Sequence, residues 1–240
     1  MKIKMYTVPN MITLLNLLCG SMAVVCILRY GEPRVAFALI AAAAVFDFCD
    51  GFAARLLGSS SEIGVQLDSL ADMVSFGLAP AVTAWSMYGA APQQGVWGAQ
   101  AGAAVLVIAA FSALRLARFN IDTEQKSEFI GMPTPANAML WGSLGYLSAG
   151  DPSLLPRWAI VLLAVVMSLL LVAPVRMFSL KFHGFGFRDN RLRYLFLLAS
   201  AATVALMRSA GAVPVIIALY AAVSAVRHLW LLRNRESNHC

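Results

Sequence analysis

The sequence predicts an all-α fold, a polytopic integral membrane bundle of about eight transmembrane helices with both termini in the cytoplasm. Three observations lead to this prediction. First, 60% of the 240 residues are hydrophobic and only 12% are charged, with a mean hydropathy of +0.74, whereas soluble domains are about half apolar and a quarter charged. Second, apolar windows of about 20 residues recur, and that length crosses a hydrocarbon core of about 30 Å. Third, the basic residues are distributed unevenly between the loops.

The apolar windows give the expected helices in chain order. Asn10 is placed to cap the first helix, and the Gly31-Glu32-Pro33 turn returns the chain to the membrane. The second and third windows contain carboxylates, and the fifth is shorter than the others. Because no repeat or low-complexity linker divides the chain, residues 1–240 are expected to form one domain. The windows cover residues 11–29, 35–55, 64–87, 100–117, 134–150, 157–175, 193–210 and 212–232.

The loops between these windows differ strongly in their lysine and arginine content. Cytoplasmic loops of membrane proteins carry an excess of these residues. The basic set of ends includes both termini and the loop from Arg55 to Gly64, which are therefore predicted to be cytoplasmic. Fourteen basic residues belong to it: Lys2, Lys4, Arg55, Arg115, Arg118, Lys126, Arg176, Lys181, Arg188, Arg191, Arg193, Arg227, Arg233 and Arg235. Four belong to the opposite set: Arg29, Arg34, Arg157 and Arg208.

The net charge of +6 is attributed to this topology and to attraction toward anionic lipid headgroups. A nucleic-acid partner is not expected, because no basic run is interleaved with aromatic residues. The four cysteines show no metal-ligand spacing and fall in apolar windows or at the tail. They are expected to be small buried hydrophobic residues rather than a disulfide framework.

Charged and small residues gather on one face of each of two neighbouring windows, in helices at about 35–55 and 64–87. At 3.6 residues per turn, each set forms a single stripe along its helix. Two adjacent antiparallel helices can turn these stripes toward each other and so form a cluster of four carboxylates. The first stripe contains Asp47, Asp50, Gly51, Ala54 and Arg55. The second contains Gly64, Asp68 and Asp72.

Four ionised carboxylates held together in a membrane need a cationic partner, since desolvation and like-charge repulsion both oppose the cluster. Oxygen ligands without histidine or cysteine favour a hard divalent ion, Mg²⁺ or Mn²⁺, and two ions would balance the charge. Small residues leave room for a bulky ligand, and Arg55 offers a fork that suits phosphate oxygens. This pattern favours phosphoryl-type transfer at a membrane. The alternative is a purely structural role, in which the carboxylates pair with basic groups and the small residues permit close helix packing.

The pattern Asp47-x2-Asp50-Gly51-x2-Ala54-Arg55-x8-Gly64-x3-Asp68-x3-Asp72 resembles the signature of the CDP-alcohol phosphatidyltransferase family. Eight constrained positions within 26 residues carry the resemblance, and the number of spans and the place of the motif on the second and third also resemble that family. The resemblance implies a membrane-embedded, commonly dimeric enzyme that cleaves a CDP-linked lipid, passes the phosphatidyl group to an alcohol and releases CMP.

The same resemblance implies roles for individual residues. Asp47, Asp50, Asp68 and Asp72 would ligate two divalent cations, and Asp72 would also act as general base on the incoming hydroxyl. The CDP-lipid would contact small residues and the arginine of the motif, a serine in the loop between the helices, and a Pro-Asn-x2-Thr run at the start of the first helix. These residues are Asn10, Thr13, Asp50, Gly51, Ala54, Arg55, Ser61 and Gly64.

The segment after the fourth window bears on the acceptor alcohol. Residues 115–120 (RLARFN) and 129–138 (FIGMPTPANA) resemble the phosphatidylserine synthase branch of the family. That branch transfers the phosphatidyl group from CDP-diacylglycerol to L-serine, and an amino-acid acceptor needs a cation for its carboxylate. The expected serine pocket contains Arg115, Arg118, Asn120, Thr134 and Asn137. The two arginines are also explained as positive-inside anchors, and the Pro-Thr-Pro run as a helix-entry turn.

Two other functions stay open on the sequence. The same chemistry with glycerol 3-phosphate or an inositol phosphate as acceptor would also require arginines for the acceptor phosphate. An ion or proton transporter would place aspartates along its pathway, but that function explains neither Arg55 nor the fixed glycine and alanine positions. Release of CMP in the presence of different alcohols distinguishes transfer to serine, transfer to another acceptor and transport.

Overall fold

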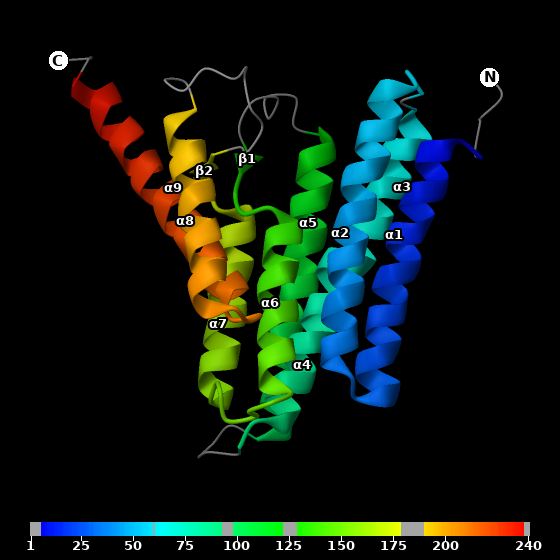
Figure 1. The fold of residues 1–240 in the computed structure, drawn as a ribbon, viewed down its shortest axis with the longest axis vertical. Helices are drawn as coiled ribbons and strands as arrows, with labels where there is room; N and C mark the ends of the chain where they lie inside the picture. Colours follow the sequence, from blue (N-terminus) through cyan, green and yellow to red (C-terminus); the bar gives the residue numbers. More distant parts are fainter. Residues whose placement is uncertain (1–5, 60, 93–97, 122–128, 179–189, 238–240) are drawn as a thin grey trace.

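The computed structural model of the chain describes residues 6–59, 61–92, 98–121, 129–178 and 190–237. These residues form a bundle of helices that run roughly along one common direction (Figure 1). The α-helices are α1 (Val8–Val25), α2 (Pro33–Leu56), α3 (Glu62–Asp72), α4 (Ala79–Ala90), α5 (Val107–Ile121), α6 (Thr134–Ser148), α7 (Arg157–Val172), α8 (Arg191–Met207) and α9 (Ala212–Ser237). Each of the eight predicted windows overlaps a helical segment, which confirms the all-α prediction.

Tighter or wider helical turns extend some of these helices. A π-helical segment, Cys26–Tyr30, continues α1, and a second one, Met73–Leu78, joins α3 to α4 without a break. A 3₁₀ segment, Ala99–Leu106, leads into α5. The third predicted window is therefore one continuous helical rod that changes its hydrogen-bond pattern directly after Asp72. Such π-helical turns occur frequently at functional sites.

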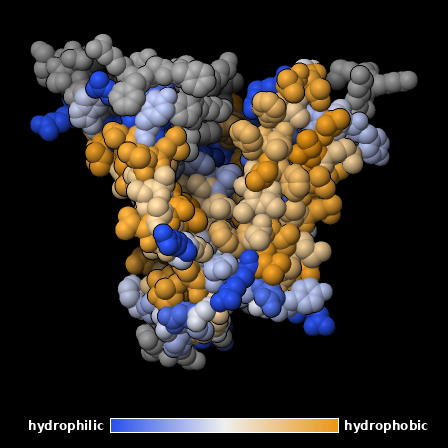
Figure 2. Space-filling model, in the orientation of Figure 1, coloured by the Kyte–Doolittle hydropathy of each residue, from blue (hydrophilic) through white to orange (hydrophobic). Residues whose placement is uncertain are grey.

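The outer surface of the bundle is that of a membrane protein. Four helical segments are long and apolar enough to cross a bilayer, namely Val8–Tyr30, Pro33–Leu56, Gln100–Ile121 and Ala212–Trp230, and Arg157–Val172 is a shorter apolar helix. Figure 2 shows hydrophobic residues over most of the visible face, with hydrophilic residues gathered mainly toward the two ends. The chain is therefore a multi-pass integral membrane protein.

The helix starts and stops follow local sequence signals, with one difference from the prediction. Thr7 caps α1, because its hydroxyl accepts a hydrogen bond from the Asn10 backbone N–H at 3.4 Å. The prediction of Asn10 as the cap was wrong: Pro9 fits in the first turn of a helix, so the helix begins earlier. Gly31, with φ of +64°, ends the first span, and Pro33 opens α2 as expected.

The two ends of the bundle follow the predicted pairing of loops. In Figure 1, the start of α1, the connection between α2 and α3, and the end of α9 all lie at the same end of the molecule. The first described helix therefore begins, and the last one ends, on the side of the α2–α3 connection, while the side on which the termini themselves lie stays a prediction. That this side is the cytoplasm stays a prediction from the distribution of basic residues.

Small residues allow the helices around the motif to approach closely. Helix α1 packs along α2, and Ala23, Ala36 and Ala43 are fully buried between neighbouring helices. At Gly20 a Cβ atom would come within 2.2 Å of the Ser75 hydroxyl oxygen, so α1 and the segment after α3 touch nearly backbone to backbone. This contact fixes α1 against the helix that carries Asp68 and Asp72.

A second core lies around Trp141, between α4, α5, α6, α7 and α9. Two short antiparallel strands lie next to this core, β1 (Phe129–Ile130) and β2 (Arg176–Met177), with Ile130 opposite Arg176. These strands were not predicted from the sequence, because two residues are too few to form a periodic pattern. They tie the segment before α6 to the segment after α7.

Candidate active site

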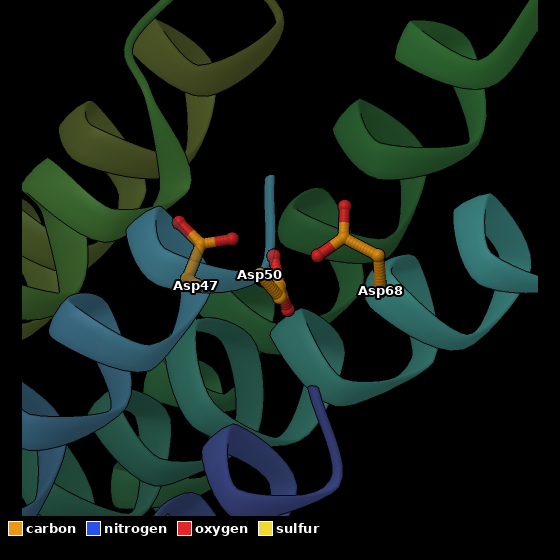
Figure 3. Close-up of side chains that lie close together, drawn as sticks. All are labelled: Asp47, Asp50 and Asp68. Atoms are coloured by element: carbon orange, nitrogen blue, oxygen red, sulfur yellow. The ribbon is translucent and has the colours of Figure 1, made fainter. Parts of the chain in front are cut away.

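Three carboxylates from two helices meet in one place. Asp47 and Asp50 lie on α2 and Asp68 lies on α3, and one oxygen atom from each lies within 4.8 Å of the other two. Figure 3 shows the three side chains pointing into a common space. Asp50 is buried and the other two are half-buried. The structure therefore brings together three of the four carboxylates of the predicted cluster.

The fourth carboxylate, Asp72, is not a member of this close group. It is buried, at 8% exposure, and accepts a hydrogen bond from the Asn16 side-chain amide at 3.0 Å. Asn16 is itself fully buried, and the Ser75 hydroxyl donates to its backbone oxygen at 3.0 Å. Asn16 was not among the residues predicted for the site. Its spacing from Asn10 and Thr13, six and three residues, was the available signal, since it places all three on one buried face of α1.

Helix α1 also holds the carboxylate of Asp50. The Thr13 hydroxyl donates to Asp50 Oδ2 at 2.6 Å and lies 3.1 Å from the backbone oxygen of Pro9. Thr13 and Asp50 are both buried. Helix α1 therefore supplies one polar partner to Asp50 and another, Asn16, to Asp72. Each contact fixes the orientation of a carboxylate that lies beside its neighbours of the same charge.

A cleft of about 140 Å³, which we name the α1 cleft, opens on one side of the three carboxylates. Ser61 caps α3 at its edge, because its hydroxyl accepts the Gly64 backbone N–H at 3.1 Å. A Cβ at Gly64 would lie 3.2 Å from both Asn10 Oδ1 and Ser61 Oγ, so a larger residue would narrow the cleft. The cleft is lined by Pro9, Asn10, Thr13, Asp50, Gly51, Ala54, Ser59, Ser61, Gly64, Val65 and Asp68.

Seven of the eight residues predicted to contact the CDP-lipid line the α1 cleft. The exception is Arg55, which is exposed in the last turn of α2 and is not among the lining residues. Its predicted contact with phosphate stays a prediction. Pro9, Ser59 and Val65 also line the cleft and were not predicted. Their chemistry is unspecific, and only the packing of α1 against α3 brings them to the same place.

A second cavity, of about 210 Å³, lies on the other side of the carboxylates, and we name it the α5 cavity. It combines acidic residues of the motif with the buried Arg115 of α5 and with the turn that opens α6. Asp68 lines both the α5 cavity and the α1 cleft. The lining residues of the α5 cavity are Asp47, Asp68, Ser69, Asp72, Arg115, Leu116, Phe119, Pro133, Thr134 and Pro135.

Two of the five residues predicted for a serine pocket, Arg115 and Thr134, line the α5 cavity, and three do not. Arg118 is exposed and donates to the backbone oxygen of Val172 at 3.4 Å. Asn120 is exposed and bonds Ser69, its amide donating to the Ser69 hydroxyl at 2.8 Å. Asn137 is fully buried, and within the described part of the chain neither polar atom of its side chain has a hydrogen-bond partner.

A third cavity, of about 320 Å³, has a nearly continuous apolar lining and shares two residues with the α5 cavity. Those two are Pro133 and Pro135, at the start of α6. The other residues of this apolar cavity come from α6, α8, α9 and the segment after β2: Ala136, Phe178, Phe196, Ile216, Ile217 and Tyr220. An apolar chain in this cavity would therefore reach the edge of the α5 cavity, which the acidic residues also line.

Comparison with known proteins shows the family to which the chain is related. The sequence profile of the CDP-alcohol phosphatidyltransferase family matches residues 6–185. The CDP-diacylglycerol–serine O-phosphatidyltransferase of Mycobacterium leprae is 38% identical over 145 residues, which cover 57% of this chain and 46% of the relative. The Bacillus subtilis protein of the same name is 39% identical over 134 residues, covering 55% of this chain and 71% of its own. The Methanocaldococcus jannaschii protein of the same name is 31% identical over 173 residues, which cover 72% of this chain and 74% of the relative.

The coverage of these relatives is uneven. The matched region spans about half the length of the mycobacterial relatives, and more than two thirds of the Bacillus and Methanocaldococcus proteins. The family match includes the four carboxylates of the motif, the residues that line the α1 cleft and the α5 cavity, and the strand pair, and it ends before α8. Helices α8 and α9, which form part of the apolar cavity, lie outside it.

Proposed function

The chain belongs to the CDP-alcohol phosphatidyltransferase family, and on that premise we propose that it transfers a phosphatidyl group from CDP-diacylglycerol to L-serine, forming phosphatidylserine and CMP. Three relatives from distant organisms carry the name of this activity. The observation that carries the proposal is the α5 cavity, where a buried arginine and the carboxylate of Asp72 line the same space. A serine molecule offers a carboxylate to the first and a hydroxyl to the second.

The close carboxylates suit a divalent cation. The family is generally dependent on divalent metal ions. Two oxygen ligands on opposite sides of one Mg²⁺ ion stand about 4 Å apart, and the oxygens of Asp47, Asp50 and Asp68 all lie within 4.8 Å of one another. An all-carboxylate set selects a hard ion, so we propose that these residues, with Asp72, hold two ions of Mg²⁺ or Mn²⁺. When bound, such ions neutralise charge on the pyrophosphate during transfer.

The α1 cleft is the proposed site for the CDP part of the lipid. Its walls are formed by small residues of α2 and α3 and by the polar face of α1, so a planar base and its phosphates can lie close to the backbone. Asn10 and Thr13 supply polar groups, and the N-terminus of α3, capped by Ser61, presents backbone N–H groups that favour an anionic ligand. The exposed Arg55 is proposed to reach the phosphates from the edge.

The α5 cavity is the proposed site for serine. Arg115 pairs with the carboxylate of serine, because a guanidinium offers a fork that fits a carboxylate. Asp72 takes the proton of the serine hydroxyl as its oxygen attacks the lipid-side phosphorus of CDP-diacylglycerol. A new bond forms between this oxygen and phosphorus, and the bond from phosphorus to the bridging oxygen breaks. CMP leaves with the electron pair of that bond.

The apolar cavity between α6, α8 and α9 offers a place for an acyl chain. It shares Pro133 and Pro135 with the proposed serine site, so a chain bound there would be continuous with a phosphate at the carboxylates. This supports a diacyl lipid as the second substrate. We further propose that the protein lies in the cytoplasmic membrane as a homodimer, with the site near the cytoplasmic face. The basic residues at that end support the orientation.

A panel of acceptors tests the proposed function. Purified protein is incubated with labelled CDP-diacylglycerol, with and without Mg²⁺ or Mn²⁺, and with L-serine, glycerol 3-phosphate or inositol phosphate. We expect labelled phosphatidylserine and an equal amount of CMP with L-serine and metal only. Product from glycerol 3-phosphate but not from serine would overturn the choice of acceptor. Cation flux into liposomes without any CMP release would support a transporter instead.

A further inference from the structure

The turn between β1 and α6 is pressed against the end of α7. Gly131 has φ of +76°, and its N–H donates to the Val175 backbone oxygen at 2.9 Å. The N–H of Met132 donates to the Leu170 backbone oxygen at 3.0 Å. A Cβ atom at Gly131 would lie 2.2 Å from the Leu171 backbone oxygen, far inside contact distance. Glycine is therefore required at position 131 for two reasons: the positive φ, and the absence of space for a side chain.

The other side of this turn holds Arg115. The Arg115 Nε group donates to the backbone oxygen of Met132, and Nη2 donates to that of Gly131 at 3.4 Å. Arg115 is 7% exposed and lines the α5 cavity. Within the described residues these two carbonyls are its hydrogen-bond partners. Because a guanidinium carries five N–H groups, the two anchored ones fix its plane and leave the others available to a ligand.

We propose that Gly131 is a positioning residue for acceptor selection: the Gly131–Met132 turn uses its two carbonyl groups to orient Arg115 toward the carboxylate of the acceptor. This inference rests on the proposed function of the α5 cavity and names the device that sets its specificity. The turn can do this only while it lies flat against Leu171. Any side chain at position 131 moves the two carbonyls, and Arg115 then loses its fixed direction without losing its charge.

The end of α7 stabilises the same arrangement from a second direction. Arg118, one turn after Arg115 on α5, donates to the Val172 backbone oxygen at 3.4 Å. Ile130 and Arg176 pair in the strand ladder just before the turn. The turn is thus held by backbone hydrogen bonds on its far side, so that its carbonyls provide a rigid support for a flexible side chain. A rigid support for a binding group lowers the ordering cost of binding.

The test compares Gly131→Ala with the wild-type protein, using L-serine and L-serinamide, which keeps the hydroxyl and the ammonium group but has no carboxylate. In Gly131→Ala we expect KM for L-serine to rise at least about 10-fold, the effect of weakening a charged hydrogen-bonded pair. KM for CDP-diacylglycerol and kcat at saturating serine should stay within about threefold. The preference for L-serine over L-serinamide should fall by the same factor as the serine affinity.

Controls separate this role from general damage to the fold. Gly31→Ala introduces a similar backbone strain at φ of +64° but meets no atom within 4 Å, so it should keep the serine preference. Arg115→Lys keeps the charge but lacks the planar fork whose direction the two carbonyls fix, and it should lose the preference even if Gly131→Ala fails to fold. The double variant Gly131→Ala/Arg115→Ala should have the same serine KM as Arg115→Ala alone.

Two results would overturn the inference. The first is a normal serine preference in folded Gly131→Ala or in Arg115→Lys. The second is a serine KM in the double variant that exceeds that of Arg115→Ala by the full effect of the glycine substitution, because independent effects add. If the wild-type protein does not accept L-serine, the proposed function itself fails, and that result is seen before any variant is compared.

Discussion

Replacement of Asp72 by asparagine tests the proposed base, which is also one of the four proposed metal ligands. Asparagine has almost the same shape as aspartate, and its side-chain oxygen can still accept the hydrogen bond that Asn16 donates at 3.0 Å. The substitution therefore removes the charge and the ability to take a proton while the contact with α1 is retained. Asp72 lies outside the close group of Asp47, Asp50 and Asp68, so that group keeps its full charge.

The expected loss follows from the role of a general base. A positioned side chain that takes a proton in the transition state contributes about 10²- to 10⁴-fold to the rate, or roughly 3–5 kcal/mol of barrier. We expect kcat of Asp72→Asn to fall by about this factor. Because Asp72 is also a proposed metal ligand, the Mg²⁺ concentration for half-maximal activity should rise as well, but saturating Mg²⁺ should not restore kcat.

The assay measures CMP release and labelled phosphatidylserine from purified protein at saturating substrates, over a series of Mg²⁺ concentrations. Thermal unfolding in detergent verifies that Asp72→Asn is folded. Near-normal transfer by the folded variant would refute the assignment of Asp72 as the base. A rate that returns to normal at high Mg²⁺ would instead identify Asp72 chiefly as a metal ligand.

Three further substitutions test the site at other points. Asp68→Asn should raise the Mg²⁺ concentration for half-maximal activity by at least about 10-fold, because an amide is a weaker ligand than a carboxylate; an unchanged metal titration would contradict this. Asn16→Ala should lower kcat by about 10-fold, because the hydrogen bond to Asp72 is lost. Asn16→Asp is the matched variant of the same size. Wild-type kcat in Asn16→Ala would show that the contact is dispensable. Ser61→Ala should cost about 1 kcal/mol of stability through loss of the α3 cap, whereas Ser61→Thr should retain it; equal melting temperatures would argue against the cap.

The helices and the carboxylates were predictable because their signals are local. Apolar windows of membrane length and the spacing of residues on one helix face both follow from fixed helical geometry, so α2 and the Asp47–Asp50 pair could be placed from sequence alone. Seven of the residues that line the α1 cleft were predicted to contact the CDP-lipid through the resemblance to a family. The cap of α1 was missed, because Thr7 and Asn10 both have capping side chains and the sequence did not decide between them.

Contacts between distant helices could not be predicted in the same way. Asn16 meets Asp72 across 56 positions of sequence, and no pattern within α1 reveals which polar residue faces which carboxylate. Arg118 and Arg115 look equivalent in sequence, as both lie at the end of the fourth window. The structure separates them, since Arg115 turns into the α5 cavity and Arg118 bonds the end of α7. That difference depends on where the turn at Gly131 lies.

The spacing of the motif follows from the two cavities. On α3, Gly64 lines only the α1 cleft, Asp68 lines both cavities, and Asp72 lines only the α5 cavity. On α2 the order is reversed, because Asp47 lines the α5 cavity while Asp50, Gly51 and Ala54 line the α1 cleft.

Since α2 and α3 run in opposite directions, these opposite orders match in space. Eight helical residues span about 12 Å, which is enough to separate the ends of a reaction in which one group arrives as another departs. Two stripes with a period of about four residues, one on each helix, therefore lead from the proposed nucleotide site to the proposed serine site. An insertion of a single residue within either stripe would turn the residues after it by about 100° relative to those before it. The two sites would then be unconnected.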